Sequence, residues 1–254
     1  MNFISKGMKQ EYEKYTREDH AIWGILFNRQ LENLQGKACS EYLQSVDELS
    51  LNINNSEVAN FNKLESSLKK TGWTIEVVEG LIPVEDFFQL LAKKRFCSST
   101  WLRNRAQLDY LEEPDMFHDT FGHIPLLMNT TYASFMQKFG ELGVAHINDD
   151  RALTALQRLY WFTIEFGLMK SKEKPLIYGA GVLSSYGEVN HIYENTKVEL
   201  LEYDVEAIAH NPFINSEIQM RYYLIDSFEQ LFNSLEVMGE ILAKGIKIEP
   251  NIVR

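Results

Sequence analysis

Residues 113–127 read EPDMFHDTFGHIPLL and hold two histidines, His118 and His123, among apolar and aromatic side chains. Pro114 suits the first turn of a helix, because the N–H that proline lacks would have no partner inside the helix there. Asp115 then lies one turn before His118 on the same face. A carboxylate in that place can accept the spare ring N–H of a metal-bound imidazole and orient it. We therefore expect Asp115 to hydrogen-bond the ring of His118.

The spacing of the two histidines is unusual for a metal pair. Five residues of an ideal α-helix rotate by about 140°, so His118 and His123 would not share a face. In the zinc-protease motif H-E-x-x-H, by contrast, the i, i+4 spacing puts both histidines on one face. Gly122 and Pro125 predict that the helix distorts or ends there, which lets the two rings converge. Spacing alone still favours two ordinary histidines over two metal ligands.

An acidic residue farther along the chain is the candidate third ligand. We expect a helix over residues 150–169, on which Trp161 and Glu165 share a face. A carboxylate buried in so apolar a run needs a partner, which a divalent metal would supply. Two histidines and one carboxylate form the facial ligand set of non-heme iron(II) oxygenases, with coordination positions left open. The ordinary alternative is a core aromatic beside a solvated acid. The apolar neighbours of Glu165 are Phe162, Ile164, Phe166 and Leu168.

The remaining sequence predicts a mostly α fold with a few short β-strands. Thr16 and Asp19 form a capping pair before a helix that runs to about Gly36. No repeat, linker or composition shift marks a second domain. Further helices are expected over residues 40–49, 58–70, 83–94, 132–144 and 150–169. We expect strands at residues 74–78, 176–178, 222–225 and 246–248, an extended stretch at 95–101 and a loop at 52–56.

Composition and charge exclude several classes of partner. The 254 residues are 45% hydrophobic and 24% charged, a normal globular balance. The 25 basic and 36 acidic residues give a net charge of −11, which disfavours nucleic acid and anionic membranes. Cys39 and Cys97 are expected to be reduced thiols. Neither a signal core nor an apolar run near the roughly 18 residues of a membrane helix is present, so we expect a cytoplasmic protein.

Three stretches together identify a family. Residues 113–127, residues 160–168 (YWFTIEFGL) and residues 178–188 (YGAGVLSSYGE) resemble the pterin-dependent aromatic amino-acid hydroxylases. The resemblance is closest to the bacterial phenylalanine 4-hydroxylases and extends from about residue 15 to about residue 234. It implies a single helical catalytic domain over residues 1–254, with neither the regulatory domain nor the tetramerisation helix of animal members. We therefore expect a monomer or a weak dimer.

The resemblance also implies an activity and its cofactors. We expect a phenylalanine 4-monooxygenase that converts L-phenylalanine to L-tyrosine with O2. The implied cofactors are iron(II), held by His118, His123 and Glu165, and a tetrahydropterin, either tetrahydrobiopterin or a related pterin. The pterin supplies electrons that activate O2 at the iron.

Individual residues match binding positions of the family. Phe87 matches a pterin-stacking phenylalanine and Ile82 an aliphatic pterin contact, while Asp119 and Tyr160 belong to the same pocket. Arg103 matches an arginine that binds the substrate's carboxylate, a task that suits a forked guanidinium. The matches that would line the amino-acid site are Trp161, Pro114, Phe166, Ser184 and Ser185.

Each match has an ordinary alternative. Phe87 could be a core residue, Arg103 a surface charge, and the two serines caps of a turn. Cys97 departs from the pattern, because animal phenylalanine hydroxylases have a histidine there beside the active site.

Other activities remain open on the sequence. The same chemistry could act on tryptophan or tyrosine, but Trp161 favours phenylalanine because tryptophan-specific members tend to carry phenylalanine there. A zinc-dependent hydrolase, with Asp119 as the general base, or a metal-binding protein without turnover would use the same ligands. No protease motif or oxyanion-hole motif accompanies Asp119, and metal content separates these alternatives.

Overall fold

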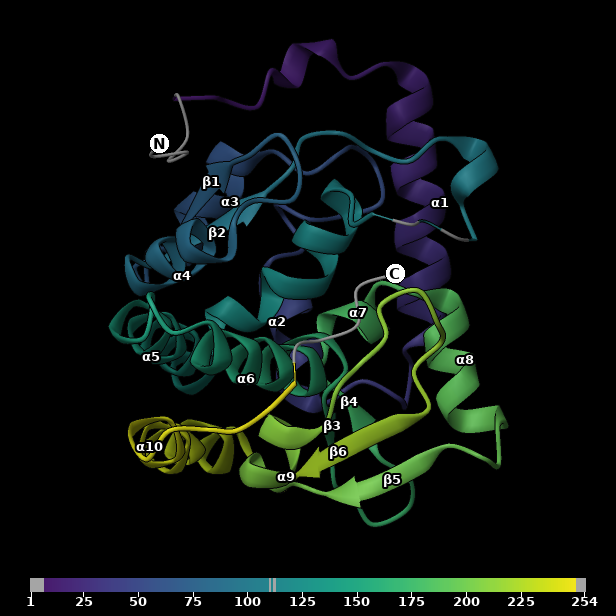
Figure 1. Ribbon diagram of the computed structural model, residues 1–254. Helices are drawn as coiled ribbons and strands as arrows, with labels where there is room; N and C mark the ends of the chain where they lie inside the picture. The colour runs from purple at the N-terminus through teal and green to yellow at the C-terminus, as the bar shows by residue number, and fades with distance from the viewer. Residues whose placement is uncertain (1–6, 110, 112, 250–254) are drawn as a thin grey trace.

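The computed structural model describes residues 7–109, 111 and 113–249, and it confirms a mostly α fold with short strands. Figure 1 shows α5 lying between α4 and α10, and α1 running along the opposite side of the molecule. The α-helices are α1 (Arg17–Asn33), α2 (Ser40–Glu48), α3 (Phe61–Leu68), α4 (Val84–Ala92), α5 (Thr130–Ala145), α6 (Asp150–Tyr160), α7 (Ala180–Leu183), α8 (Tyr186–Glu194), α9 (Val205–His210) and α10 (Phe228–Ala243).

Two small sheets and several short helices complete the fold. The π-helices are η3 (His118–His123) and η5 (Trp161–Glu165), and the 3₁₀ helices are η1 (Tyr12–Lys14), η2 (Arg105–Gln107) and η4 (Pro125–Met128). The strands are β1 (Thr74–Val77), β2 (Arg95–Ser98), β3 (Leu168–Met169), β4 (Leu176–Ile177), β5 (Glu199–Glu202) and β6 (Arg221–Ile225). Strands β1 and β2 pair in parallel, and the second sheet has the order β4-β3-β6-β5.

The N-terminal helix begins as its sequence predicts. The Thr16 hydroxyl accepts a hydrogen bond from the backbone N–H of Asp19, and the Asp19 carboxylate accepts one from the Thr16 backbone N–H. This capping box satisfies two N–H groups that the first turn of α1 leaves free.

Three expected elements differ from the structure. Helix α3 begins only at Phe61, because the Asn60 side chain caps it by accepting from the backbone N–H of Lys63. The helix predicted over residues 150–169 is α-helical only to Tyr160, continues as η5 to Glu165, and gives way to β3.

The strand predicted at residues 246–248 is also wrong. Ile246 is buried in the core, yet residues 246–248 are not paired in a sheet. The Arg158 side chain instead donates a hydrogen bond to the carbonyl oxygen of Glu249, so a side chain anchors this backbone.

The hydrophobic core packs against η3, the helix that contains both histidines. Phe117 and Phe121 are fully buried and stack with ring centroids 4.8 Å apart. Trp23 and Phe27 of α1 pack edge-on against this pair, and the Tyr42 hydroxyl donates a 2.7 Å hydrogen bond to the carbonyl oxygen of Phe121. The aromatic residues next to the histidines in sequence therefore anchor η3 in the core. Within the described ranges, no helix has both the length and the apolarity to cross a bilayer.

Candidate active site

Two π-helices bring the three predicted metal ligands together. His118 and His123 begin and end η3, and Glu165 ends η5. A π-helix closes its hydrogen bonds from i to i+5, so side chains five residues apart lie one above the other. In η5 this bond is visible, because the Phe166 backbone N–H donates to the carbonyl oxygen of Trp161 at 2.9 Å. The predicted distortion of the histidine helix is thus a change to π geometry.

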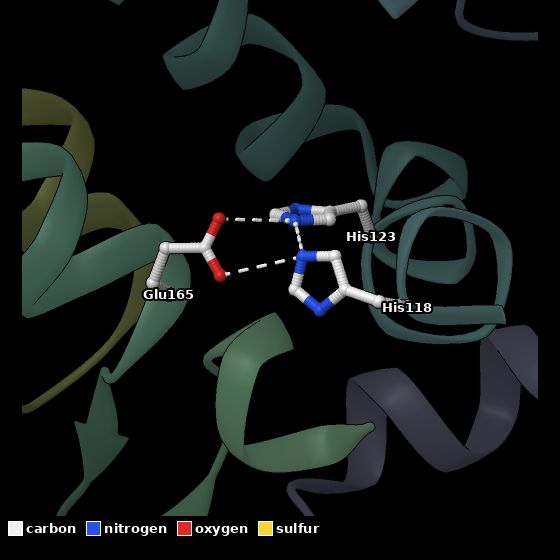
Figure 2. Close-up of side chains that lie close together, drawn as sticks. All are labelled: His118, His123 and Glu165. Carbon is white, nitrogen blue, oxygen red and sulfur yellow. Dashed lines mark hydrogen bonds and ion pairs between the residues drawn. The ribbon is translucent and has the colours of Figure 1, made fainter. Parts of the chain in front are cut away.

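The ligand atoms converge on one small region. Figure 2 shows both imidazole rings and the carboxylate pointing toward one another. The two Nε2 atoms of His118 and His123 are 3.1 Å apart. Nε2 of His118 is 3.6 Å from Glu165 Oε2, and Nε2 of His123 is 3.2 Å from Oε1. Metal–ligand bonds of about 2 Å place neighbouring ligand atoms about 3 Å apart, so this set fits one transition-metal ion.

The protonation states suit metal binding. Burial lowers the pKa of His118 to about 4, so its imidazole is neutral at neutral pH. Burial alone would raise the pKa of Glu165, but His123, His118 and a hydrogen bond from Tyr160 together lower it to about 2. A neutral imidazole and an ionised carboxylate are the forms in which these groups ligate a metal.

The predicted partner of the His118 ring is wrong. Nδ1 of His118 lies 2.9 Å from the hydroxyl oxygen of Ser184, not beside Asp115. Asp115 is fully buried and accepts from Nε and Nη2 of Arg103 at 2.8 and 2.9 Å. It also accepts from the backbone N–H of His118. A charged guanidinium competes for a carboxylate better than a neutral imidazole does.

A pocket opens beside the ligands. Its volume is about 190 Å³, and it is partly open to solvent. Its walls include all four residues predicted for the pterin, namely Ile82, Phe87, Asp119 and Tyr160. His123, Glu165 and Pro114 line the same pocket, so Pro114 lies on this side of the site.

Asp119 is the acidic group of this pocket that is not a candidate metal ligand. Burial raises its pKa to about 7, although hydrogen bonds from the backbone N–H of Ser99 at 2.9 Å and the hydroxyl of Ser98 at 3.2 Å oppose the shift. Sequence reasoning missed both serines, because they lie 21 and 20 positions before Asp119 and no local motif links them to it.

Comparison with known proteins settles the family. Residues 3–253 match the model of the biopterin-dependent aromatic amino acid hydroxylases. The chain belongs to this family. It is 42% identical to the phenylalanine-4-hydroxylase of Ralstonia nicotianae, over 89% of this chain and 72% of that one. It is 41% identical to the Chromobacterium violaceum phenylalanine-4-hydroxylase, over 89% of this chain and 76% of that one.

Solved structures agree with the sequence comparison. The C. violaceum phenylalanine hydroxylase with bound iron(III) and 7,8-dihydrobiopterin superposes with a TM-score of 0.87 at 39% identity, covering 96% of this chain and 88% of that one. The structure of the same enzyme with iron and phenylalanine gives a TM-score of 0.84 at 37% identity, with the same shares covered.

The other residues predicted to bind the substrate differ in their contacts. Trp161 and Phe166 pack together with ring centroids 4.5 Å apart. Ser184 is buried against His118, and the Ser185 hydroxyl accepts from the Glu188 backbone N–H as the N-cap of α8. Ser185 thus has the capping role that the sequence left as an alternative.

Arg103 is not the surface charge that the sequence left open. It is 7% exposed and forms the two-bond ion pair with Asp115 described above. Sequence reasoning also missed Phe213 and Gln219, which contact Trp161 from a distant part of the chain. No periodicity or motif marks either residue.

Proposed function

We propose that this hydroxylase is a phenylalanine 4-monooxygenase, with iron(II) held by His118, His123 and Glu165. The observation that carries the proposal is the convergence of two histidines and one carboxylate beside a pocket lined by an aromatic ring and a half-buried acid. The curated relatives named phenylalanine-4-hydroxylase support the choice of substrate. When bound, a tetrahydropterin would supply two electrons, which balances entry of one atom of O2 into the ring and reduction of the other to water.

The pterin would bind in the pocket beside the metal. Phe87 offers a ring for stacking, and Ile82 adds apolar contact. Tyr160 packs edge-on against Phe87 with centroids 5.2 Å apart, which holds the stacking ring in place. Asp119, with its pKa near neutrality, would accept or donate a hydrogen bond to a pterin ring nitrogen.

The amino acid would bind on the other side of the ligands. Arg103 uses Nε and Nη2 to hold Asp115, which leaves the Nη1–Nη2 edge as the fork for a substrate carboxylate. Trp161 begins η5 and Glu165 ends it, and we expect the indole to flank the substrate ring. A tryptophan there narrows the site and favours phenylalanine over the larger indole of tryptophan.

The domain organisation, the oligomeric state and the cellular location belong to the same proposal. Residues 1–254 would act as a single catalytic domain, because the described residues share one hydrophobic core. A monomer or weak dimer is the oligomeric state that the sequence predicts. A cytoplasmic location fits the two cysteines, which are free thiols in the structure.

The experiment is anaerobic reconstitution with iron(II), followed by addition of tetrahydropterin and O2 with phenylalanine, tryptophan or tyrosine in parallel. We expect tyrosine from phenylalanine at the highest kcat/KM. A higher kcat/KM for tryptophan or tyrosine would change the proposed substrate but not the family. Hydrolytic activity with zinc and no hydroxylation with iron would contradict it.

A further inference from the structure

A loop far along the chain covers the tryptophan of the substrate site. Residues 211–220, here called the cover loop, connect α9 to β6. Phe213 stacks on Trp161, with ring centroids 4.3 Å apart and planes 6° from parallel. All residues of the cover loop are exposed or half-buried except Gln219, which is 7% exposed. A buried amide inside an exposed loop calls for a defined set of hydrogen bonds.

Gln219 uses both ends of its side-chain amide. Its Oε1 accepts the indole N–H of Trp161 at 3.2 Å, and its Nε2 donates to the carbonyl oxygen of Arg221 at 2.7 Å. The indole N–H can only donate and the carbonyl can only accept, so the amide has one satisfactory orientation. Because Arg221 is the first residue of β6, this amide connects the indole to the start of that strand.

The backbone of Gln219 is held as well. The Tyr222 hydroxyl lies 2.9 Å from the carbonyl oxygen of Gln219 and 2.9 Å from a carboxyl oxygen of Glu188. Glu188 belongs to α8, so the Tyr222 hydroxyl links Gln219 to that helix. Two elements, β6 and α8, thus fix the position of Gln219 relative to the site.

We propose that Gln219 is a positioning residue for substrate choice, which holds the indole of Trp161 in one orientation and so sets the ring size that the site accepts. This inference rests on the proposed function and extends it to a residue 58 positions from Trp161. Without the acceptor, the indole N–H loses its fixed partner, and the indole is restrained by ring packing against Phe213 and Phe166 without a directional bond. The indole can then turn, which widens the space beside Glu165 for a larger substrate ring.

The test compares Gln219→Leu with the wild type in two backgrounds. Leucine keeps much of the volume and removes the acceptor. In the wild-type background we expect the ratio of kcat/KM for tryptophan to that for phenylalanine to rise about 2- to 10-fold, the effect of losing one ordinary hydrogen bond. In the Trp161→Phe background, which has no indole N–H, the same substitution should leave the ratio unchanged. Iron content should be that of the wild type throughout.

A control and a second variant keep the result interpretable. Ile218→Ala alters the neighbouring, 56% exposed residue of the cover loop and should leave the ratio unchanged. If Gln219→Leu does not fold, Tyr222→Phe removes only the hydroxyl that holds the Gln219 backbone, and it should shift the ratio in the same direction.

Two results would overturn the role of Gln219. One is an unchanged ratio in an active, iron-loaded Gln219→Leu enzyme. The other is an equal shift in the Trp161→Phe background, which would show that Gln219 acts by another route. A wild-type protein that hydroxylates none of the aromatic amino acids would instead contradict the proposed function itself.

Discussion

At the scale of single residues, the site separates groups that bind metal from groups that hold those ligands. The Ser184 hydroxyl donates its only hydrogen to the carbonyl oxygen of Ala180 at 2.8 Å, so it accepts a hydrogen bond from Nδ1–H of His118 at 2.9 Å. This pair of bonds turns Nε2 of His118 toward Glu165. Asp115 holds Arg103 and the backbone of His118. The same acid thus links the metal ligand to the proposed carboxylate site.

Two substitutions should separate ring recognition from carboxylate recognition. Trp161→Phe enlarges the site and should raise the ratio of kcat/KM for tryptophan to that for phenylalanine. The change should correspond to about 1–3 kcal/mol of activation free energy, because apolar pockets discriminate shape weakly. Arg103→Lys should weaken all aromatic substrates about equally, since lysine cannot form the two-bond fork. Steady-state kinetics with each amino acid measures both effects. An unchanged ratio in Trp161→Phe would remove the structural reason for choosing phenylalanine.

Glu188 should make stability depend on pH. Burial raises its pKa above the ordinary value of 4.5, although hydrogen bonds from Tyr222 and Gln219 oppose the shift. The folded protein therefore binds this proton more tightly than the unfolded chain. The resulting stabilisation is present below the ordinary pKa and is lost as pH rises through the raised pKa.

Urea unfolding of the metal-free protein and of Glu188→Gln at several pH values tests this. The free energy of unfolding of the wild type should fall relative to that of the variant as pH rises. A difference that stays constant across the acidic range would contradict the assignment.

At the scale of elements, the site depends on close approach between η3, η5 and α7. A Cβ added at Gly122 would lie 2.8 Å from the carbonyl oxygen of Ala180 and 3.1 Å from its Cβ. Gly167 similarly gives room to the Tyr178 ring, where α6 and η5 give way to β3. Small residues at these contacts let the two π-helices face each other.

Gly122→Ala should therefore destabilise the fold by about 1–3 kcal/mol, because the clash is with backbone that cannot turn away. Iron affinity should fall too, since η3 must move away from α7. Gly187→Ala is the matched control: it lies in α8 with nothing within 4 Å of the added Cβ. It should stabilise the protein by about 0.5–1 kcal/mol. Chemical unfolding measures both, and a neutral Gly122→Ala would contradict the packing argument.

Much of the element pattern could be predicted, and its failures have physical causes. Local signals predicted α1, because Thr16 and Asp19 cap it from within four residues. The π geometry of η5 was not predicted, because it depends on one backbone bond from Phe166 to Trp161. The candidate ligands were predicted from their chemistry together with the resemblance to a family. The partner of Asp115 was not, since Arg103 is brought to it by the loop after β2.

At the scale of the whole molecule, the candidate metal site joins two separate parts of the chain. His118 and His123 lie in η3, ahead of α5, whereas Glu165 follows α6. An ion bound there links these segments in the folded protein, while the unfolded chain has no preformed site. Metal binding should therefore stabilise the entire fold.

Removal of the metal should lower Tm. At a free metal concentration 100 times Kd, binding contributes about 2.7 kcal/mol, or a Tm increase of about 5 to 10 °C for a protein of this size. Calorimetry with and without iron(II), under anaerobic conditions, measures this. His118→Ala, His123→Ala and Glu165→Ala should each fold, lose iron and hydroxylation, and show no metal-dependent shift. Wild-type iron content in any one of them would exclude that residue as a ligand.

The central claim is that the chain inserts an atom of O2 into phenylalanine. The most direct measurement is the mass of the tyrosine formed from phenylalanine, iron(II) and tetrahydropterin under oxygen-18 gas in ordinary water. We expect the new hydroxyl group to carry the oxygen-18 label. Unlabelled tyrosine, with its hydroxyl derived from water, or no tyrosine from the fully reconstituted protein, would contradict the account.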